Sequence, residues 1–183
     1  MHPALSRSIV VVIFVLPALA WASEPGLRPL PFDGELWQLD RARIIEVDGR
    51  HALVGTAYAT GVTFDDGILE VDVKVPSKDV PSYPGFIFRM ASPDDAERVY
   101  VRPHRSPLYD DAVHYMPVFH GNSGWQLYSG PGFTAGVGIP VDTWFTIRLE
   151  IAGTRAKVSV DGRPALEIME LVHGARTGGF GLI

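Results

Sequence analysis

The chain has 183 residues, enough for one domain with a sizeable core, and its net charge of −5 gives no basis for binding nucleic acid. It contains no cysteine, which excludes disulfides, a thiol nucleophile and a thiolate metal site. Glycine and proline number 19 and 15, a composition typical of short strands joined by many turns.

The first 22 residues have the pattern of a secretory signal peptide. Residues 1–8 carry one arginine and no acid, residues 9–19 are almost wholly apolar, and Ala20-Trp21-Ala22 supplies small residues for cleavage. We expect cleavage after Ala22, a secreted or periplasmic mature protein, and no membrane association after cleavage. The apolar run is too short for a comfortable membrane span, and a retained anchor is the alternative.

Residues 23–31, with three prolines, are expected to form an extended leader into a domain over 32–183. Short alternating segments bounded by Gly, Pro or Asp then predict strands. The predicted strands are 43–47, 50–55, 67–75, 85–90, 98–103, 113–119, 125–130, 144–151, 156–160, 164–168 and 178–183. Asp48-Gly49 and Asp161-Gly162 are typical hairpin turns.

Helix signals are weak along the whole chain. The one modest candidate is short and lies near 167–173. Many short strands with hairpin links and almost no helix predict an all-β sandwich or barrel, and the absence of an internal repeat argues against a propeller. The final segment, 178–183, has the pattern of a strand cut short, so we expect the domain to be truncated at its C-terminus.

Several segments together resemble a known superfamily. They are "FDDGILEVDVKV", "PGFIFRM", "WFTIRLEIAGTRAKVSVDGRPAL", "GGFGL" and, most specifically, "ERVYVRPHRS…DAVHYMPVFHGNSGWQLYSGPG". They resemble the laminin-G-like branch of the concanavalin A-like lectin/glucanase superfamily, in particular a group of secreted bacterial domains. The resemblance implies a jelly roll of two antiparallel sheets, one of them concave, and a concave face that often binds or cleaves glycans.

The stretch "RVYVRPH" places unlike side chains on the two faces of one strand. Because successive side chains point to opposite faces, Val99 and Val101 share one face, while the cations and the phenol share the other. Arg89 joins this second face if the neighbouring strand keeps its parity. Arginine recognises carboxylates through two parallel hydrogen bonds, and aromatic rings suit the apolar faces of sugars. The candidate ligand-binding residues are Arg89, Arg98, Tyr100, Arg102, His104, Tyr115 and Trp125.

The alternative for this face is structural, with the cations paired to Glu97, Asp110 or Asp111. Catalysis by the retaining β-glucanase motif Glu-x-Asp-x-x-Glu is not expected, because Glu70-Val71-Asp72 is followed by Val75 where the third carboxylate belongs. No catalytic residue and no metal ligand is assigned.

The sequence gives only weak indications of a metal site. Calcium is the one cofactor considered, at the doublets Asp65-Asp66 and Asp110-Asp111, since laminin-G-like domains sometimes bind it with loop carboxylates. Calcium needs six to eight oxygens, and no loop supplies a recognisable set. The histidines at 104, 114 and 120 match no common zinc spacing.

The sequence therefore predicts a secreted carbohydrate-binding module that recognises a poly- or oligosaccharide on the concave sheet, with an acidic glycan best suited to the arginines. One alternative is a glycoside hydrolase or polysaccharide lyase acting on the same face, with acid/base chemistry from His104, Tyr100 or Tyr115. The other is a non-catalytic structural or protein-interaction domain.

Overall fold

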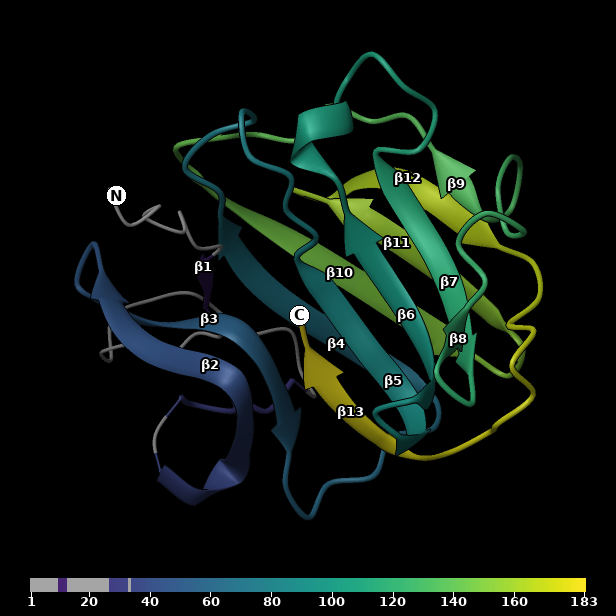
Figure 1. The fold of residues 1–183 in the computed structure, drawn as a ribbon, viewed down its shortest axis with the longest axis horizontal. Helices are drawn as coiled ribbons and strands as arrows, with labels where there is room; N and C mark the ends of the chain where they lie inside the picture. Colours follow the sequence, from purple (N-terminus) through teal and green to yellow (C-terminus); the bar gives the residue numbers. More distant parts are fainter. Residues whose placement is uncertain (1–9, 13–26, 33) are drawn as a thin grey trace, which may run out of the picture.

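The computed structural model describes residues 10–12, 27–32 and 34–183, and its regular structure is almost entirely β (Figure 1). The strands are β1 (Val10–Val12), β2 (Trp37–Val47), β3 (Arg50–Ala59), β4 (Gly67–Lys74), β5 (Gly85–Ser92), β6 (Asp95–Val101), β7 (Val113–Phe119), β8 (Asn122–Ser123), β9 (Thr134–Ala135), β10 (Trp144–Ala152), β11 (Arg155–Val160), β12 (Arg163–Ile168) and β13 (Gly179–Leu182). Two short 3-10 turns are η1 (Gly34–Leu36) and η2 (Pro103–Arg105).

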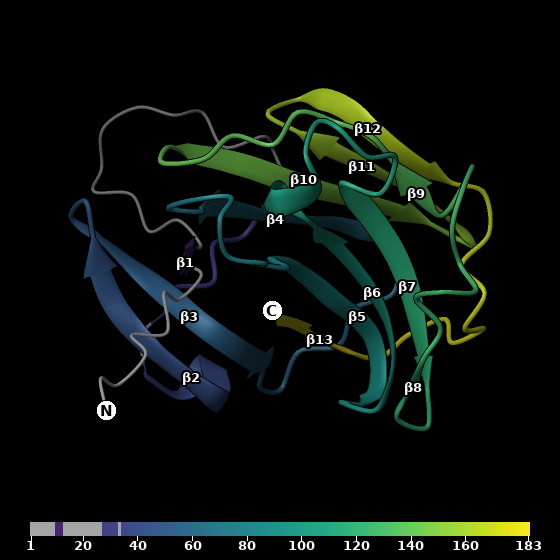
Figure 2. The ribbon, with the colours of Figure 1, turned by 45° about the horizontal axis from the view of Figure 1, so that its top comes forward.

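The strands form two antiparallel layers, which Figure 2 shows one above the other. The back sheet has the order β12-β11-β10-β4, and the front sheet has the order β3-β13-β5-β6-β7-β8, with β2 beside β3 and β9 beside β7. Strand β1 pairs with both β4 and β3 and so joins the layers along one side. The predicted jelly-roll sandwich is confirmed.

The hydrophobic core lies between the two sheets because each strand alternates apolar and polar side chains. Phe86 and Phe88 of β5 face Phe145 and Leu149 of β10 across this core, and Phe88 is fully buried. The expected inward parity of Phe88 is therefore confirmed.

Two hairpins form where the sequence predicted them. Asp48 and Gly49 have φ values of 52° and 73°, and Asp161 and Gly162 have φ values of 49° and 70°. Two successive residues with positive φ match the right-handed twist of the flanking strands, which is why Asp-Gly is favoured there.

Two predicted elements are wrong. Residues 125–130, expected as a strand, form turns in which the amides of Leu127 and Tyr128 both bond to the carbonyl of Gly124. Residues 167–173, the one helix candidate, instead contain the end of β12 and a turn, because Leu166 and Ile168 alternate into the core as strand residues do.

The predicted signal peptide overlaps the described strand β1. Val11 lies opposite Leu53 of β3 on one side and Val73 of β4 on the other. The rest of the signal peptide and residues 23–26 lie outside the described residues, and residues 27–31 form no regular structure. Within the part of the chain that is described, no helix is long and apolar enough to cross a bilayer.

Replacing Phe88 with alanine should destabilise the domain by about 3–5 kcal/mol, through lost burial and the cavity left behind. Denaturant unfolding measures the change. Leu108→Ala is the control, because Leu108 is 84% exposed and its loss should change the free energy of unfolding little. Equal effects of the two substitutions would contradict the assigned core.

N-terminal sequencing of the exported protein tests the signal peptide directly. We expect a mature chain that begins at Ser23, which would remove β1 from the sheet. A chain that keeps Met1 or Val10 would contradict the signal peptide and make β1 a permanent strand between the layers.

Candidate functional site

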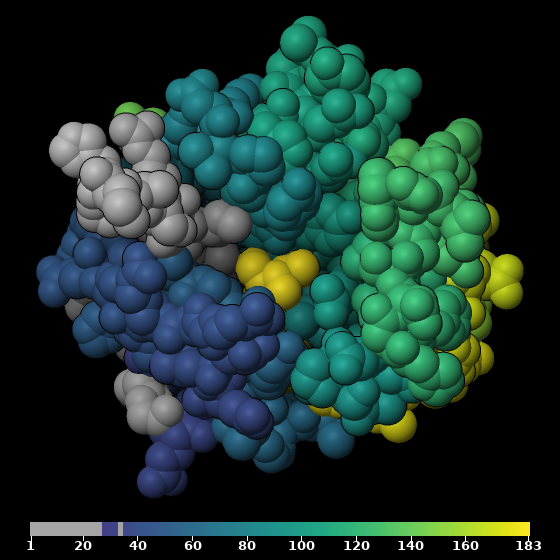
Figure 3. Space-filling view, viewed as in Figure 1, coloured from purple at the N-terminus to yellow at the C-terminus, as the bar shows by residue number. Residues whose placement is uncertain are grey.

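The outward side chains of the front sheet form one continuous surface, called the front face below. Its central members are Tyr58, Ile87, Arg98, Tyr100, His114 and Met116. Tyr100 lies between Gly85 and His114 on the neighbouring strands, and Arg98 lies between Ile87 and Met116. Figure 3 shows this face hollowed around the end of β13 (yellow), between the β2–β3 hairpin (blue) and the segment from β7 to β9 (green).

A row of aromatic rings follows the upper part of the front face. Tyr83 makes edge-to-face contacts with Tyr100 at 5.8 Å and with His104 at 5.4 Å between ring centroids, and Tyr100 lies 5.4 Å from His114. Tyr83 is 43% exposed, whereas Tyr100 and His114 are buried beneath their neighbours. Tyr83 therefore presents a fixed aromatic surface to solvent.

Tyr100, His104 and His114 of this row are neutral near pH 7. Burial raises the pKa of Tyr100 to about 12, so its hydroxyl stays protonated. Burial also lowers the pKa of His104 and of His114, and the positive charge of Arg102 acts in the same direction on both. The Nδ1 atom of His114 is buried without a hydrogen-bond partner among the described residues, and its Nε2 contacts the carbonyl of Tyr128 at 2.8 Å.

Arg102 lies beside this row but is already ion-paired. Asp111 binds Arg102 through one carboxylate oxygen and Arg105 through the other. Burial acts to raise the pKa of Asp111, but the two guanidiniums outweigh it and hold that pKa below its usual value. Arg102 is therefore ion-paired with Asp111, as the structural alternative in the sequence analysis expected.

Arg98 differs from Arg102 in having no such partner. Its one hydrogen bond to the described residues runs from Nη2 to the carbonyl of Pro93 at 3.0 Å. Its Nε, like that of Arg102, is buried without a hydrogen-bond partner among the described residues. The positive charge of Arg98 opposes the rise that burial causes in the pKa of both Tyr58 and Tyr100.

The expectation that Arg89 lies on this face is wrong. A bulge interrupts the pairing of β5 with β6 after Phe88, and Arg89 has a positive φ of 48°. The bulge reverses the parity, so the side chain turns inward and is only 1% exposed. Its guanidinium donates to the Asp66 carboxylate at 2.9 Å and to the carbonyls of Gly153 and Ala175.

The expectation that Tyr115 lies on this face is also wrong. Tyr115 pairs with Val99, shares its inward parity and is fully buried in the core. Its hydroxyl donates to the carboxylate of Glu97, which is itself fully buried, and accepts the amide of Val172 at 2.7 Å. Burial raises the pKa of both Glu97 and Tyr115, so the tyrosine is not a base at neutral pH.

Trp125 lies in the turn after β8 and is 47% exposed. Among the described residues, no ring contact joins it to the row that contains Tyr83 and Tyr100. The structure therefore brings together four of the seven predicted site residues, which are Arg98, Tyr100, Arg102 and His104. It adds Tyr83 and His114, which the sequence analysis did not assign to a ligand.

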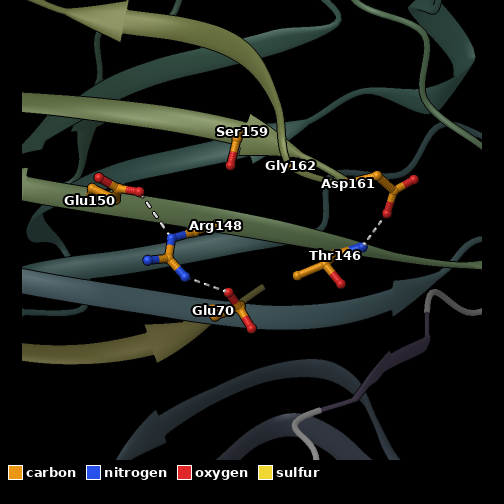
Figure 4. A pocket seen from close by; sticks show the side chains of 7 residues that line it. All are labelled: Glu70, Thr146, Arg148, Glu150, Ser159, Asp161 and Gly162. Carbon is orange, nitrogen blue, oxygen red and sulfur yellow. Dashed lines mark hydrogen bonds and ion pairs between the residues drawn. The ribbon is translucent and has the colours of Figure 1, made fainter. Parts of the chain in front are cut away.

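The back sheet carries a shallow depression of about 410 Å³, shown in Figure 4. Arg148 lies between Glu70 and Glu150, at 3.0 and 2.9 Å, and the Asp161 carboxylate accepts the amide of Thr146. No aromatic side chain lines it. Its arginine is ion-paired with its two glutamates, so we regard this depression as a solvated sheet surface.

The acidic doublets do not fit a calcium site. The Asp66 carboxylate accepts the amide of Gly153 and pairs with Arg89, and the Asp111 carboxylate is held by two arginines. Carboxylates already engaged by cations and amides have few oxygens left for a metal that needs six or more. No group of three or more His, Asp or Glu suited to a metal ion occurs among the described residues.

Comparison with solved structures identifies the fold of the chain. No protein-family model and no curated protein sequence matches the chain. Solved structures do match, and one is the carbohydrate-binding module CBM66 from Bacillus subtilis. It has a TM-score of 0.61 and 15% sequence identity, over 80% of this chain and 86% of that one.

Two other solved structures match the chain with lower TM-scores. A Bacteroides ovatus mixed-linkage glucan GH16 protein, in complex with a G4G4G3G product, matches with a TM-score of 0.52 and 10% identity, over 77% of this chain and 69% of that one. The Emp46p carbohydrate recognition domain, in metal-free form, matches with a TM-score of 0.51 and 12% identity, over 81% and 80%. The chain thus has the concanavalin A-like jelly-roll fold, and these neighbours do not single out the laminin-G-like branch.

Replacing Arg89 with methionine should lower the free energy of unfolding by about 2–3 kcal/mol, because the Asp66 carboxylate and the carbonyls of Gly153 and Ala175 lose a buried charged donor. Urea unfolding measures the loss. Arg155→Met is the matched control, since Arg155 is exposed and its recorded contact is with the sulfur of Met169. If both variants unfold like the parent, the buried role of Arg89 is wrong.

Proposed function

We propose that this protein is a secreted carbohydrate-binding module that recognises a poly- or oligosaccharide on the front face without cleaving it. The observation that carries the proposal is the exposed ring of Tyr83, which packs edge-to-face against Tyr100 and His104. Tyr100 belongs to the front face, which Figure 3 shows hollowed around the end of β13. A preorganised aromatic surface beside polar donors suits a sugar, which has apolar ring faces and hydroxyl edges. The shared fold with a carbohydrate-binding module and a carbohydrate recognition domain supports the same reading by analogy.

The chemistry of the front face favours binding over hydrolysis. Retaining and inverting glycosidases both need two carboxylates that flank the scissile bond. The central members of the front face include no carboxylate, and Glu97, the one acid near the middle of β6, points into the core. Asp111, the acid beside the aromatic row, is engaged by two arginines, so the described residues offer no pair of free carboxylates there.

A lyase on this face is also disfavoured. Lyases use a Tyr or His as the base, and a phenol with a pKa of about 12 is a poor base at neutral pH. His104 remains as a neutral imidazole, but its Nδ1 lies 3.4 Å from the amide of Ser82 and is oriented by it. We therefore assign His104 to the support of Tyr83 rather than to proton transfer.

Replacing Tyr83 with alanine should weaken glycan binding about tenfold or more, because the exposed aromatic surface is lost. Glycan-array screening identifies a binding saccharide, and calorimetry measures its affinity for each variant. Thermal stability should change little, since Tyr83 is partly exposed.

Glu70→Gln on the back sheet is the control and should leave glycan affinity unchanged. Loss of binding in Glu70→Gln but not in Tyr83→Ala would move the site to the back sheet. Release of reducing ends from a bound saccharide would overturn the non-catalytic assignment.

A further inference from the structure

Arg98 occupies the middle of the front face. It lies between Ile87 and Met116 on the neighbouring strands and two residues from Tyr100 on its own strand. Tyr58 lies in the same row, beyond Ile87 and Gly181. Ile87 is fully buried and Met116 is 6% exposed. Arg98 therefore has apolar neighbours on both adjacent strands, and its guanidinium reaches toward the β5–β6 turn, where it donates to the carbonyl of Pro93.

Arg98 and Arg102 differ in their ion pairing. Asp111 neutralises Arg102 and fills part of its hydrogen-bonding capacity. Arg98 has no ion pair within the described residues and bonds to a single backbone carbonyl. The Nε atoms of both arginines are buried without an acceptor among the described residues, so the missing ion pair is what distinguishes Arg98. A buried donor without a partner is costly, and an oxyanion that supplied an acceptor would remove that cost.

We propose that Arg98 is an anion-recognition residue and that the preferred ligand is a glycan that carries a carboxylate or a sulfate. This inference rests on the proposed glycan-binding function. Tyr100 lies two residues along β6 on the same face and belongs to the aromatic row on which the sugar ring would lie.

Two matched pairs of oligosaccharides test the proposal. One pair is a polyuronate and its carboxyl-reduced form, and the other is a sulfated galactan and its desulfated form. We expect the wild-type protein to bind the acidic member of at least one pair about tenfold or more tightly than its neutral counterpart, as expected for a charge-assisted hydrogen bond. The pair that shows the preference identifies carboxylate or sulfate as the group recognised.

Arg98→Gln should remove the preference, so that the acidic and neutral members bind equally, and its thermal unfolding profile checks that the domain is intact. Arg98→Lys keeps the charge without the planar fork and should restore part of the preference, which keeps the test informative if Arg98→Gln is unstable. Arg155→Gln, an exposed arginine of the back sheet, should leave the preference unchanged.

The outcomes separate this inference from the proposed function. Equal binding of acidic and neutral members by the wild type overturns the role of Arg98 and leaves glycan binding intact. A preference that survives in Arg98→Gln likewise overturns it. If neither pair binds and the glycan array is also blank, the proposed function itself fails.

Discussion

The structure depends on a buried polar network that attaches the segment between β12 and β13 to the front sheet. Glu97 is fully buried and is satisfied by the hydroxyl of Tyr115 and the amide of His173. Tyr115 in turn holds the amide of Val172, and Arg89 holds the carbonyl of Ala175. Because leaving such groups unpaired inside a core is costly, the chain after β12 must run past them before it enters the sheet as β13.

This constraint also shapes the front face. The anchored segment delivers β13 between β3 and β5, and Gly181 leaves space there for the ring of Tyr58, since a Cβ would lie 2.9 Å from it. Because Glu97 turns inward, no acidic side chain of the described residues forms an ion pair with Arg98 on the outward surface. The back sheet shows the opposite pattern, with Arg148 neutralised by Glu70 and Glu150.

The sequence predicted the parts of this arrangement that follow from regular alternation. The parity of residues 98–101, the inward Phe88 and both Asp-Gly turns required only local rules. Arg89 could not be placed, because one bulge with a positive φ reversed its direction and nothing in the sequence marks that bulge. Tyr115 was assigned by residue type rather than by parity. Tyr83 lies in a proline-bounded loop, where only the tertiary contacts with Tyr100 and His104 give it a role.

The central claim is that the front face binds a glycan and the back sheet does not. Hydrogen exchange measured by mass spectrometry, with and without a saccharide identified by array, tests it without any substitution. The account predicts slower exchange in residues 80–101 and in β7, with β10, β11 and β12 unchanged. Protection confined to the back sheet, or none at saturating saccharide, would contradict it.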